Sequence, residues 1–328
     1  MSSSSRPVYQ PLHPSIRPLL DLDYVAFHDK YFQYVIADDQ KPWDGSARTT
    51  TPLWPPTSSP LTPVGSIRDI ALEKFSVRVF TAATPTPDDG WPVFIWFHGG
   101  GWAIGGLSDG NDLCTLICAE ANCIVVTVGY RLAPEDPYPA PVEDSVSALE
   151  WVVSRAGSEI LGNVDKSRVA VGGTSAGGNL GAVLSMKASL LSPPIPICFQ
   201  LLVVPVIDNT ASVTGAWAQN RHAPWLTPAR MQWYRRMYLP NESDALEWDA
   251  SPSLAPMELL AQNPSTFIAV AGQDLLRPEA EGYARLLETA WREKAVEGRG
   301  ARVKVYDGAT HSILAMSGVF LLWCLDYS

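Results

Sequence analysis

The chain of 328 residues is short of histidine and of charged side chains. It has five histidines, at positions 13, 28, 98, 222 and 311, so any chemistry that needs an imidazole has few candidates. Charged residues make up 18% of the chain and hydrophobic residues 46%. This balance is typical of a protein with a large folded core, and it argues against a disordered chain.

Long apolar runs are also missing. The longest candidate, 197–207, is interrupted by Gln200 and Pro205 and falls short of the roughly 18 residues that span a bilayer. The N-terminal stretch MSSSSRPVYQPLHP has no apolar core of the kind found in secretory signals. We therefore expect no stable membrane insertion and a cytoplasmic location.

Positive charge and paired cysteines are scarce as well. Twenty-four basic residues face 34 acidic ones, a net charge of −10 that repels phosphate backbones and argues against nucleic-acid binding. The cysteines are odd in number and have no histidine at zinc-ligand spacing; they are Cys114, Cys118, Cys123, Cys198 and Cys324. We expect reduced structural thiols, no metal and no cofactor.

Short runs of β-branched and apolar residues recur from residue 66 onward. Segments 66–74 and 75–82 predict a hairpin, and buried strands are predicted at 93–99, 123–130, 168–173, 197–207, 266–272 and 302–308. Helix-length segments lie between or after them, at 138–156, 176–190, 277–297 and 311–325. This alternation predicts an α/β fold with a mostly parallel central sheet flanked by helices.

Two aromatic-rich regions break the alternation. The first contains an amphipathic pattern at 20–36 and a proline-rich connector at 51–63. The second, 208–252, holds four tryptophans and a helical pattern at 231–239. We interpret the second region, an aromatic-rich insertion at the end of a predicted strand, as a lid or cap.

The pentapeptide 173–177 reads G-T-S-A-G and lies between a predicted strand and a predicted helix. A nucleophilic serine needs this sharp turn, with small residues on either side, and Ser175 is our candidate. Gly106–Ser108–Gly110 matches the same pattern, but no strand precedes it. We interpret Ser108 as a loop or helix-cap serine.

The sequence HGGGW at 98–102 follows another predicted strand. A glycine triplet costs conformational entropy and often marks backbone that approaches a ligand closely, although a flexible turn is the simpler alternative. We predict an oxyanion hole made by the N–H groups of Gly100, Gly101 and Ala176. His98 then holds the loop and is not the base.

In this order of elements the catalytic base follows the nucleophile, which leaves His222 and His311. His311 follows the last predicted strand by a short loop, whereas His222 falls in the irregular 208–252 region. Three aspartates could orient the base. We favour Asp274, which ends a predicted strand, over Asp208, and we place Asp307 last because Asp-Gly is typical of a turn.

These motifs together resemble the hormone-sensitive lipase family of the α/β-hydrolase superfamily. The resemblance rests on HGGGW, YRLAPEDPYPAPVEDSVSALEWV (130–152), GTSAGGNL and DGATH, and it covers about residues 60–328. It implies an esterase with Ser175, His311 and Asp274 as its triad. It also implies a mainly helical cap built from residues 1–59 and 208–252, with residues 60–207 and 253–328 as the catalytic domain. The acid loop of the family often reads D-P-L-R-D-E, whereas this chain has D-L-L-R-P-E at 274–279.

The resemblance also implies roles outside the triad. Arg131 and Glu143 are interpreted as structural, and a homodimer through the final strand and helix is one expectation, since some family members pair in this way. Trp102, Trp217 and Trp225 are candidate pocket residues, although the cap's own core is the alternative for each ring. Apart from a second copy of this chain, the expected partner is a small-molecule ester.

The predicted activity is hydrolysis of small to medium acyl esters, including acetyl esters of a bulky or secondary-metabolite alcohol, through an acyl-enzyme. Two other classes remain as alternatives. The same fold hosts lyases and acyltransferases, and a small-molecule binding protein could keep the pocket without catalysis. The presence of both Ser175 and His311 argues against the binding protein.

Overall fold

One eight-stranded sheet forms the centre of the computed structural model, which describes residues 6–52, 56–313, 315 and 316. The strands are β1 (Ser66–Ala71), β2 (Ser76–Thr81), β3 (Trp91–Phe97), β4 (Ile124–Gly129), β5 (Val164–Thr174), β6 (Phe199–Val203), β7 (Ser265–Ala271) and β8 (Ala301–Tyr306). Their spatial order is β1-β2-β4-β3-β5-β6-β7-β8. The pairs β1/β2 and β2/β4 are antiparallel, and the pairs from β4/β3 to β7/β8 are parallel. The predicted hairpin and the predicted mostly parallel sheet are both confirmed.

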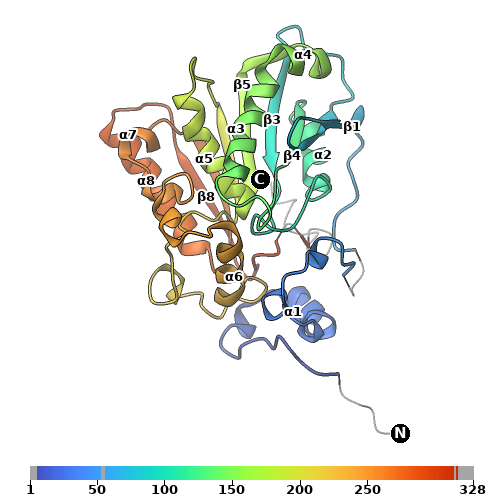
Figure 1. Cartoon of the computed structure of the whole chain (residues 1–328), viewed down its shortest axis with the longest axis vertical. Coiled ribbons are helices and arrows are strands. Elements are labelled where there is room, and N and C mark those ends of the chain that lie inside the picture. Colours follow the sequence, from blue (N-terminus) through green and yellow to red (C-terminus); the bar gives the residue numbers. More distant parts are fainter. Residues whose placement is uncertain (1–5, 53–55, 314, 317–328) are drawn as a thin grey trace.

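Helices cover the sheet. They are α1 (Leu22–Lys30), α2 (Asn111–Glu120), α3 (Ala140–Val153), α4 (Arg155–Leu161), α5 (Ala176–Leu190), α6 (Pro228–Tyr238), α7 (Met257–Leu260) and α8 (Arg277–Glu293). Helices α3 and α5 lie side by side, α5 contacts the central strands β3, β5 and β6, and α8 contacts β7 and β8 (Figure 1). Helices α1 and α6 lie beyond one end of the sheet (Figure 1).

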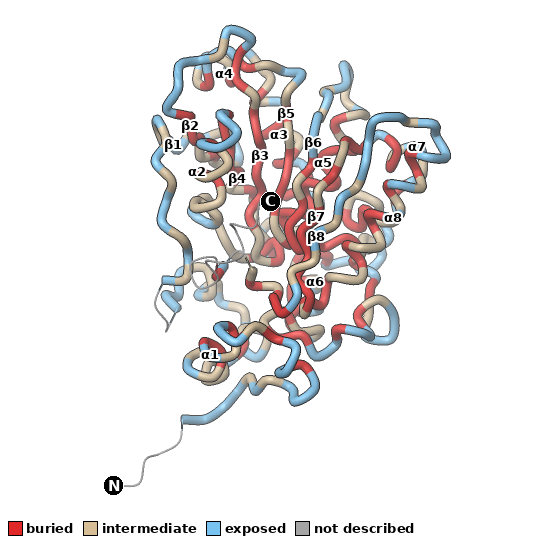
Figure 2. Tube along the Cα trace, turned by 180° about the vertical axis from the view of Figure 1, so that it is seen from behind, coloured by how far each residue is buried: buried red, intermediate tan, exposed pale blue. Residues whose placement is uncertain are grey.

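The buried core follows the central strands (Figure 2). In β3 every residue except Pro92 is buried, because helices cover both faces of a parallel sheet. A separate small cluster includes Tyr24, Phe27 and Phe32 of the N-terminal region and Met316. This cluster fastens α1 to the chain that follows His311.

Several helix predictions differ from the structure. The predicted helix 138–156 is divided at Ser154 into α3 and α4, and α7 was not predicted. The segment 20–36 forms α1, a break at Tyr31 and a short 3-10 turn, Phe32–Tyr34, rather than one helix. Helix α2 was missed, although Cys114 and Cys118 lie one helical turn apart on its buried side. The predicted helix 311–325 falls mostly outside the described residues.

Within the described ranges, no helix is both long and apolar enough to cross a membrane. Ser175, Asp274 and His311 follow the carboxyl ends of β5, β7 and β8, at one edge of the parallel part of the sheet. The chain's two aromatic-rich regions meet this same edge, through contacts described below.

Candidate active site

Ser175 lies at a sharp turn between β5 and α5. Its backbone angles, φ 55° and ψ −118°, are unfavourable for a residue with a side chain, so the surrounding structure must hold them. Two close approaches explain the flanking glycines. A Cβ on Gly173 would lie 2.2 Å from the carbonyl oxygen of Gly177, and a Cβ on Gly177 would lie 2.1 Å from that of Phe97. The turn therefore requires glycine at both positions.

His311 and Asp274 complete a hydrogen-bonded chain with Ser175. The Nε2 atom of His311 lies 2.9 Å from Ser175 Oγ, and its Nδ1 atom lies 2.9 Å from Asp274 Oδ2. The side chain of Asp274 is 1% exposed and that of His311 is 9% exposed. A buried carboxylate beside the imidazole favours the tautomer with its proton on Nδ1, which leaves Nε2 free to accept the serine proton.

The other candidates for base and acid lie elsewhere. His222 is exposed, and its ring stacks on His13 with 3.8 Å between centroids. Asp208 accepts hydrogen bonds from the backbone and side chain of Thr210. Of the candidate bases and acids compared from the sequence, the structure places His311 in contact with Ser175, and Asp274 in contact with His311.

Ser108, the serine of the second G-x-S-x-G pattern, lies in a turn before α2. Its Oγ accepts a hydrogen bond from Arg78 at 3.3 Å. Gly106 has open space where a Cβ would be. The tight backbone approaches that define the turn at Ser175 are therefore missing here.

The glycine triplet forms a loop with left-handed backbone angles. Gly100 has φ 104° and Gly101 has φ 59°. A Cβ on Gly101 would lie 2.2 Å from the ring of Tyr234 in α6, so a side chain does not fit. In the described part of the chain, no acceptor takes the N–H of Gly100 or Gly101, and the N–H of Ala176 is one of the free donors at the start of α5.

Contacts of His98, Tyr130 and Arg48 hold this loop in place. His98 is buried and stacks on Tyr130 with 4.3 Å between centroids, and Tyr130 donates to the carbonyl of His98 at 2.9 Å. Burial lowers the pKa of His98, which keeps its ring neutral. Arg48 donates to the carbonyls of Ala103 and Ala133, each at 2.8 Å. These contacts agree with a structural role for His98.

Arg131 and Glu143 also have structural surroundings. Arg131 lies 3.0 Å from Glu143 and 2.8 Å from the buried Asp144. Hydrogen bonding to Asp144 raises the pKa of Arg131. This ion pair network fixes the start of α3 against the loop after β4.

The three candidate pocket tryptophans have different surroundings. Trp102 is fully buried and stacks on Tyr238 with 4.0 Å between centroids. Trp217 is fully buried and donates to Glu279 at 3.1 Å. For these two rings the core alternative accounts for the burial. Trp225 has φ 67° and lines a cavity.

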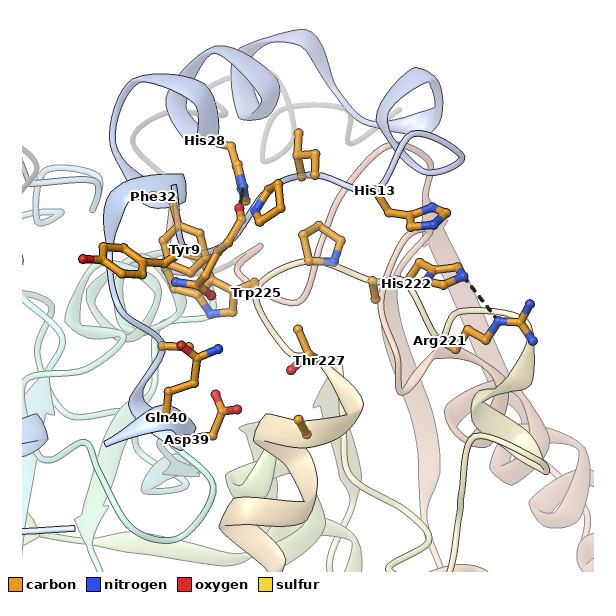
Figure 3. A pocket seen from close by; sticks show the side chains of 17 residues that line it. Tyr9, His13, His28, Phe32, Asp39, Gln40, Arg221, His222, Trp225 and Thr227 are labelled. Atoms are coloured by element: carbon orange, nitrogen blue, oxygen red, sulfur yellow. Dashed lines mark hydrogen bonds between the residues drawn. The ribbon is translucent and has the colours of Figure 1, made fainter. Parts of the chain in front are cut away.

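That cavity, of about 290 Å³, lies between the N-terminal region and residues 221–229. Phe32, whose ring stacks on that of Trp225 at 4.7 Å, forms one end, and His13, Arg221 and His222 lie at the other (Figure 3). Asp39 points into it from below (Figure 3). The cavity is thus aromatic at one end and polar at the other.

Glu279 is a buried carboxylate that joins α8 to the chain after β6. It accepts the N–H groups of Ile207 and Asp208, at 2.8 and 3.3 Å, as well as the indole N–H of Trp217. Arg235 stacks over the Trp217 ring at 4.3 Å. Burial raises the pKa of Glu279 to about 7, against the opposing effects of these hydrogen bonds and of Arg235.

The described cysteines are free thiols. Cys114, Cys118 and Cys123 are buried, and Cys198 is exposed. Burial raises the pKa of Cys118 to about 11 and that of Cys123 to about 12, so both stay protonated and unreactive at neutral pH. Cys324 lies outside the described residues. The part of the chain that the structure describes has no group of three or more His, Cys, Asp or Glu that could hold a metal ion.

A mostly parallel sheet that carries a serine on a strained strand-to-helix turn defines a class of protein, the serine hydrolases of the α/β-hydrolase superfamily. The sequence profile of a family described as alpha/beta hydrolase fold matches residues 94–315. The chain belongs to this family, and the predicted carboxylesterase-type class is confirmed.

Individual relatives agree with this assignment. An AB hydrolase superfamily protein of Schizosaccharomyces pombe is 38% identical over 97% of this chain and 94% of its own. The carboxylesterase NlhH of Mycobacterium tuberculosis is 38% identical over 67% of each chain. The structure of a thermostable esterase from Pseudomonas putida has a TM-score of 0.79 at 26% identity, covering 93% of this chain and 92% of that one.

Proposed function

We propose that this protein hydrolyses carboxylic esters through a covalent acyl-enzyme, with Ser175 as nucleophile, His311 as general base and acid, and Asp274 as the group that orients His311. One observation carries the proposal: two hydrogen bonds of 2.9 Å link the three side chains in the order that nucleophilic catalysis needs. The class of the chain supports the same chemistry.

The mechanism has two halves. Ser175 Oγ attacks the ester carbonyl while its proton passes to His311 Nε2, and the carbonyl electron pair moves onto oxygen. Asp274 stabilises the imidazolium that forms. Collapse of the tetrahedral intermediate breaks the bond to the alcohol, which leaves with the proton from Nε2. Water then repeats the sequence on the acyl-enzyme and releases the acid.

The oxyanion of each intermediate would be bound by the N–H groups of Gly100, Gly101 and Ala176. The first two have no acceptor among the described residues, and the third opens α5, where the helix dipole also favours negative charge. One such donor contributes about 3 kcal/mol to the transition state in other serine hydrolases.

We further propose that residues 1–59 and 208–252 form the cap, hereafter the two cap segments. They enclose the cavity lined by Phe32 and Trp225, and α6 places Tyr234 over Gly101. Acetyl and other short acyl esters of a bulky, partly aromatic alcohol are the substrates that this arrangement favours. The lining of this cavity includes neither the triad nor Gly100 and Gly101, so it would bind the part of the alcohol that is remote from the ester bond. Its aromatic end suits a ring or branched group, and its polar end suits hydroxyl groups on the same alcohol.

A fluorophosphonate probe followed by intact-mass analysis tests the nucleophile. The wild-type protein should gain one adduct, and Ser175→Ala should gain none. Ser108→Ala is the matched control, since it changes the serine of the other G-x-S-x-G pattern, and it should label fully. Nitrophenyl esters of increasing acyl length would then show the preference for short acyl groups. A wild-type protein that forms no adduct would reject the mechanism.

A further inference from the structure

Asn220, in the second cap segment, contacts the loop that carries the candidate acid. Its side chain is buried, at 5% exposure, in a turn where its own N–H donates to Trp217 and its carbonyl accepts from Ala223. From this turn its amide Nδ2 donates to the carbonyl oxygens of Gly272, at 3.5 Å, and of Asp274. A single side chain thus joins the cap to both ends of the 272–274 loop.

The carboxylate of Asp274 depends on this loop for its position. One oxygen accepts from His311, and among the described residues the other accepts a single long bond of 3.3 Å, from the N–H of Leu276. The N–H groups of Gly272 and Gln273 donate to the carbonyls of Tyr306 and Ala309, in the chain that leads to His311. The N–H of Asp274 donates to Ala271 at 3.2 Å, and the Arg277 guanidinium also donates to the carbonyl of Gly272, at 3.3 Å. The carbonyl of Asp274 accepts from Arg277 at 3.3 Å as well, so Asn220 supplies the bond that comes from outside the catalytic domain.

The turn that holds Asn220 is itself fixed. Trp217, three residues earlier, donates to the buried Glu279 and lies under Arg235, and Arg235 donates to the carbonyls of Asp208 and Ala211. The side chain of Asn220 is therefore presented from a rigid support rather than from a mobile lid. A rigid donor restricts its acceptor more effectively than a flexible one does.

We propose that Asn220 is a positioning residue for the acid: it sets the orientation of the Asp274 backbone, and through it the contact between the Asp274 carboxylate and His311. The cap would then take part in assembling the triad as well as in enclosing the substrate. This inference rests on the proposed function, because it assigns Asn220 a purpose only if Asp274 orients the base.

The test compares two substitutions. Asn220→Ala removes the amide, and Asn220→Asp keeps its shape but removes both N–H donors and places a carboxylate against two carbonyl oxygens. We expect kcat on a short nitrophenyl ester to fall about 10- to 100-fold in each, since a misplacement of about 1 Å in a catalytic group costs a factor of that size. KM should stay within about threefold, because Asn220 acts on the transition state through His311. Asn241→Ala, an exposed asparagine of the same cap segment, is the matched control and should match wild type.

A double-mutant cycle identifies the route of the effect. If Asn220 acts through Asp274, adding Asn220→Ala to Asp274→Ala should change the residual kcat by less than about twofold. Four outcomes would overturn the proposal: kcat within twofold of wild type, a loss confined to KM, a full loss that persists in the Asp274→Ala background, or failure of both Asn220 variants to fold. Failure of the proposed function is separate, since it appears as a wild-type protein that forms no fluorophosphonate adduct at Ser175.

Discussion

Gly101 provides a direct test of the proposed oxyanion hole. In the structure a Cβ at this position would lie 2.2 Å from the Tyr234 ring, whereas carbon atoms in contact prefer about 3.5–4.0 Å. Gly101→Ala therefore forces the loop or the ring to move by more than about 1 Å, and it adds about 1–2 kcal/mol of strain because φ is 59°. The N–H of Gly101 moves with the loop.

We expect kcat/KM for a short nitrophenyl ester to fall about 100- to 1,000-fold in Gly101→Ala, which is the loss seen when one oxyanion donor is removed. Gly106→Ala is the matched control, because it adds the same methyl group to a nearby glycine that has open space around it. That control should stay within about twofold of wild type.

A second substitution separates the clash from the strain. Tyr234→Ala removes the ring that the new methyl group meets, so the double variant should recover about tenfold or more of the activity lost in Gly101→Ala. Purely additive losses would show that Tyr234 does not restrict the loop. A Gly101→Ala protein that keeps more than a third of its activity would refute the assignment of Gly101 to the oxyanion hole.

Three further predictions follow from the buried contacts. Because burial raises the pKa of Glu279 to about 7, the native state keeps the Glu279 proton at pH values where the unfolded state has lost it. This bound proton stabilises the native state fully below about pH 4.5, and the stabilisation is lost as the pH rises to about 7. Urea unfolding should show wild type losing about 2–3 kcal/mol relative to Glu279→Gln between pH 5 and pH 8, and parallel stability curves would contradict this. Arg48→Ala should lower the free energy of unfolding by about 1–3 kcal/mol and reduce kcat, since two buried carbonyls of the oxyanion-loop region lose their donor. Arg68→Ala, which removes one exposed hydrogen bond, is the control. Equal effects of the two substitutions would contradict a role for Arg48 in holding the oxyanion loop. Trp225→Ala should raise KM for esters of bulky alcohols about tenfold while leaving methyl esters within about twofold, and an equal effect on both would remove Trp225 from the alcohol site.

Much of the fold could be predicted because it rests on local pattern. Strands β3 and β4 are apolar throughout, since both faces of the sheet are covered, and such runs are visible in the sequence. Helix α2 shows the limit of this reasoning. Its buried side carries Cys114 and Cys118. When these cysteines are considered only as metal ligands, their helical spacing is not recognised as an apolar helix face.

The candidate site was predictable where chemistry depends on neighbours in sequence. Ser175 and the glycine triplet stand out because a tight turn or a close backbone approach admits few residue types. The acid was different: Asp274, Asp208 and Asp307 all follow strands, and the sequence could only rank them. The hydrogen bond between Asp274 and His311 joins residues 37 positions apart.

The sequence by itself predicted the strands of the sheet, most of its helices, the strained turn at Ser175 and a close backbone approach at the glycine triplet, because steric limits on the backbone act between adjacent residues. Only the tertiary structure decided which carboxylate faces His311, that Trp102 and Trp217 are packed in the interior, and that Asn220 and Arg48 donate to the carbonyls of Asp274 and Ala103. Those contacts connect distant segments, and a polar side chain in an irregular region has no periodicity that reveals its partner.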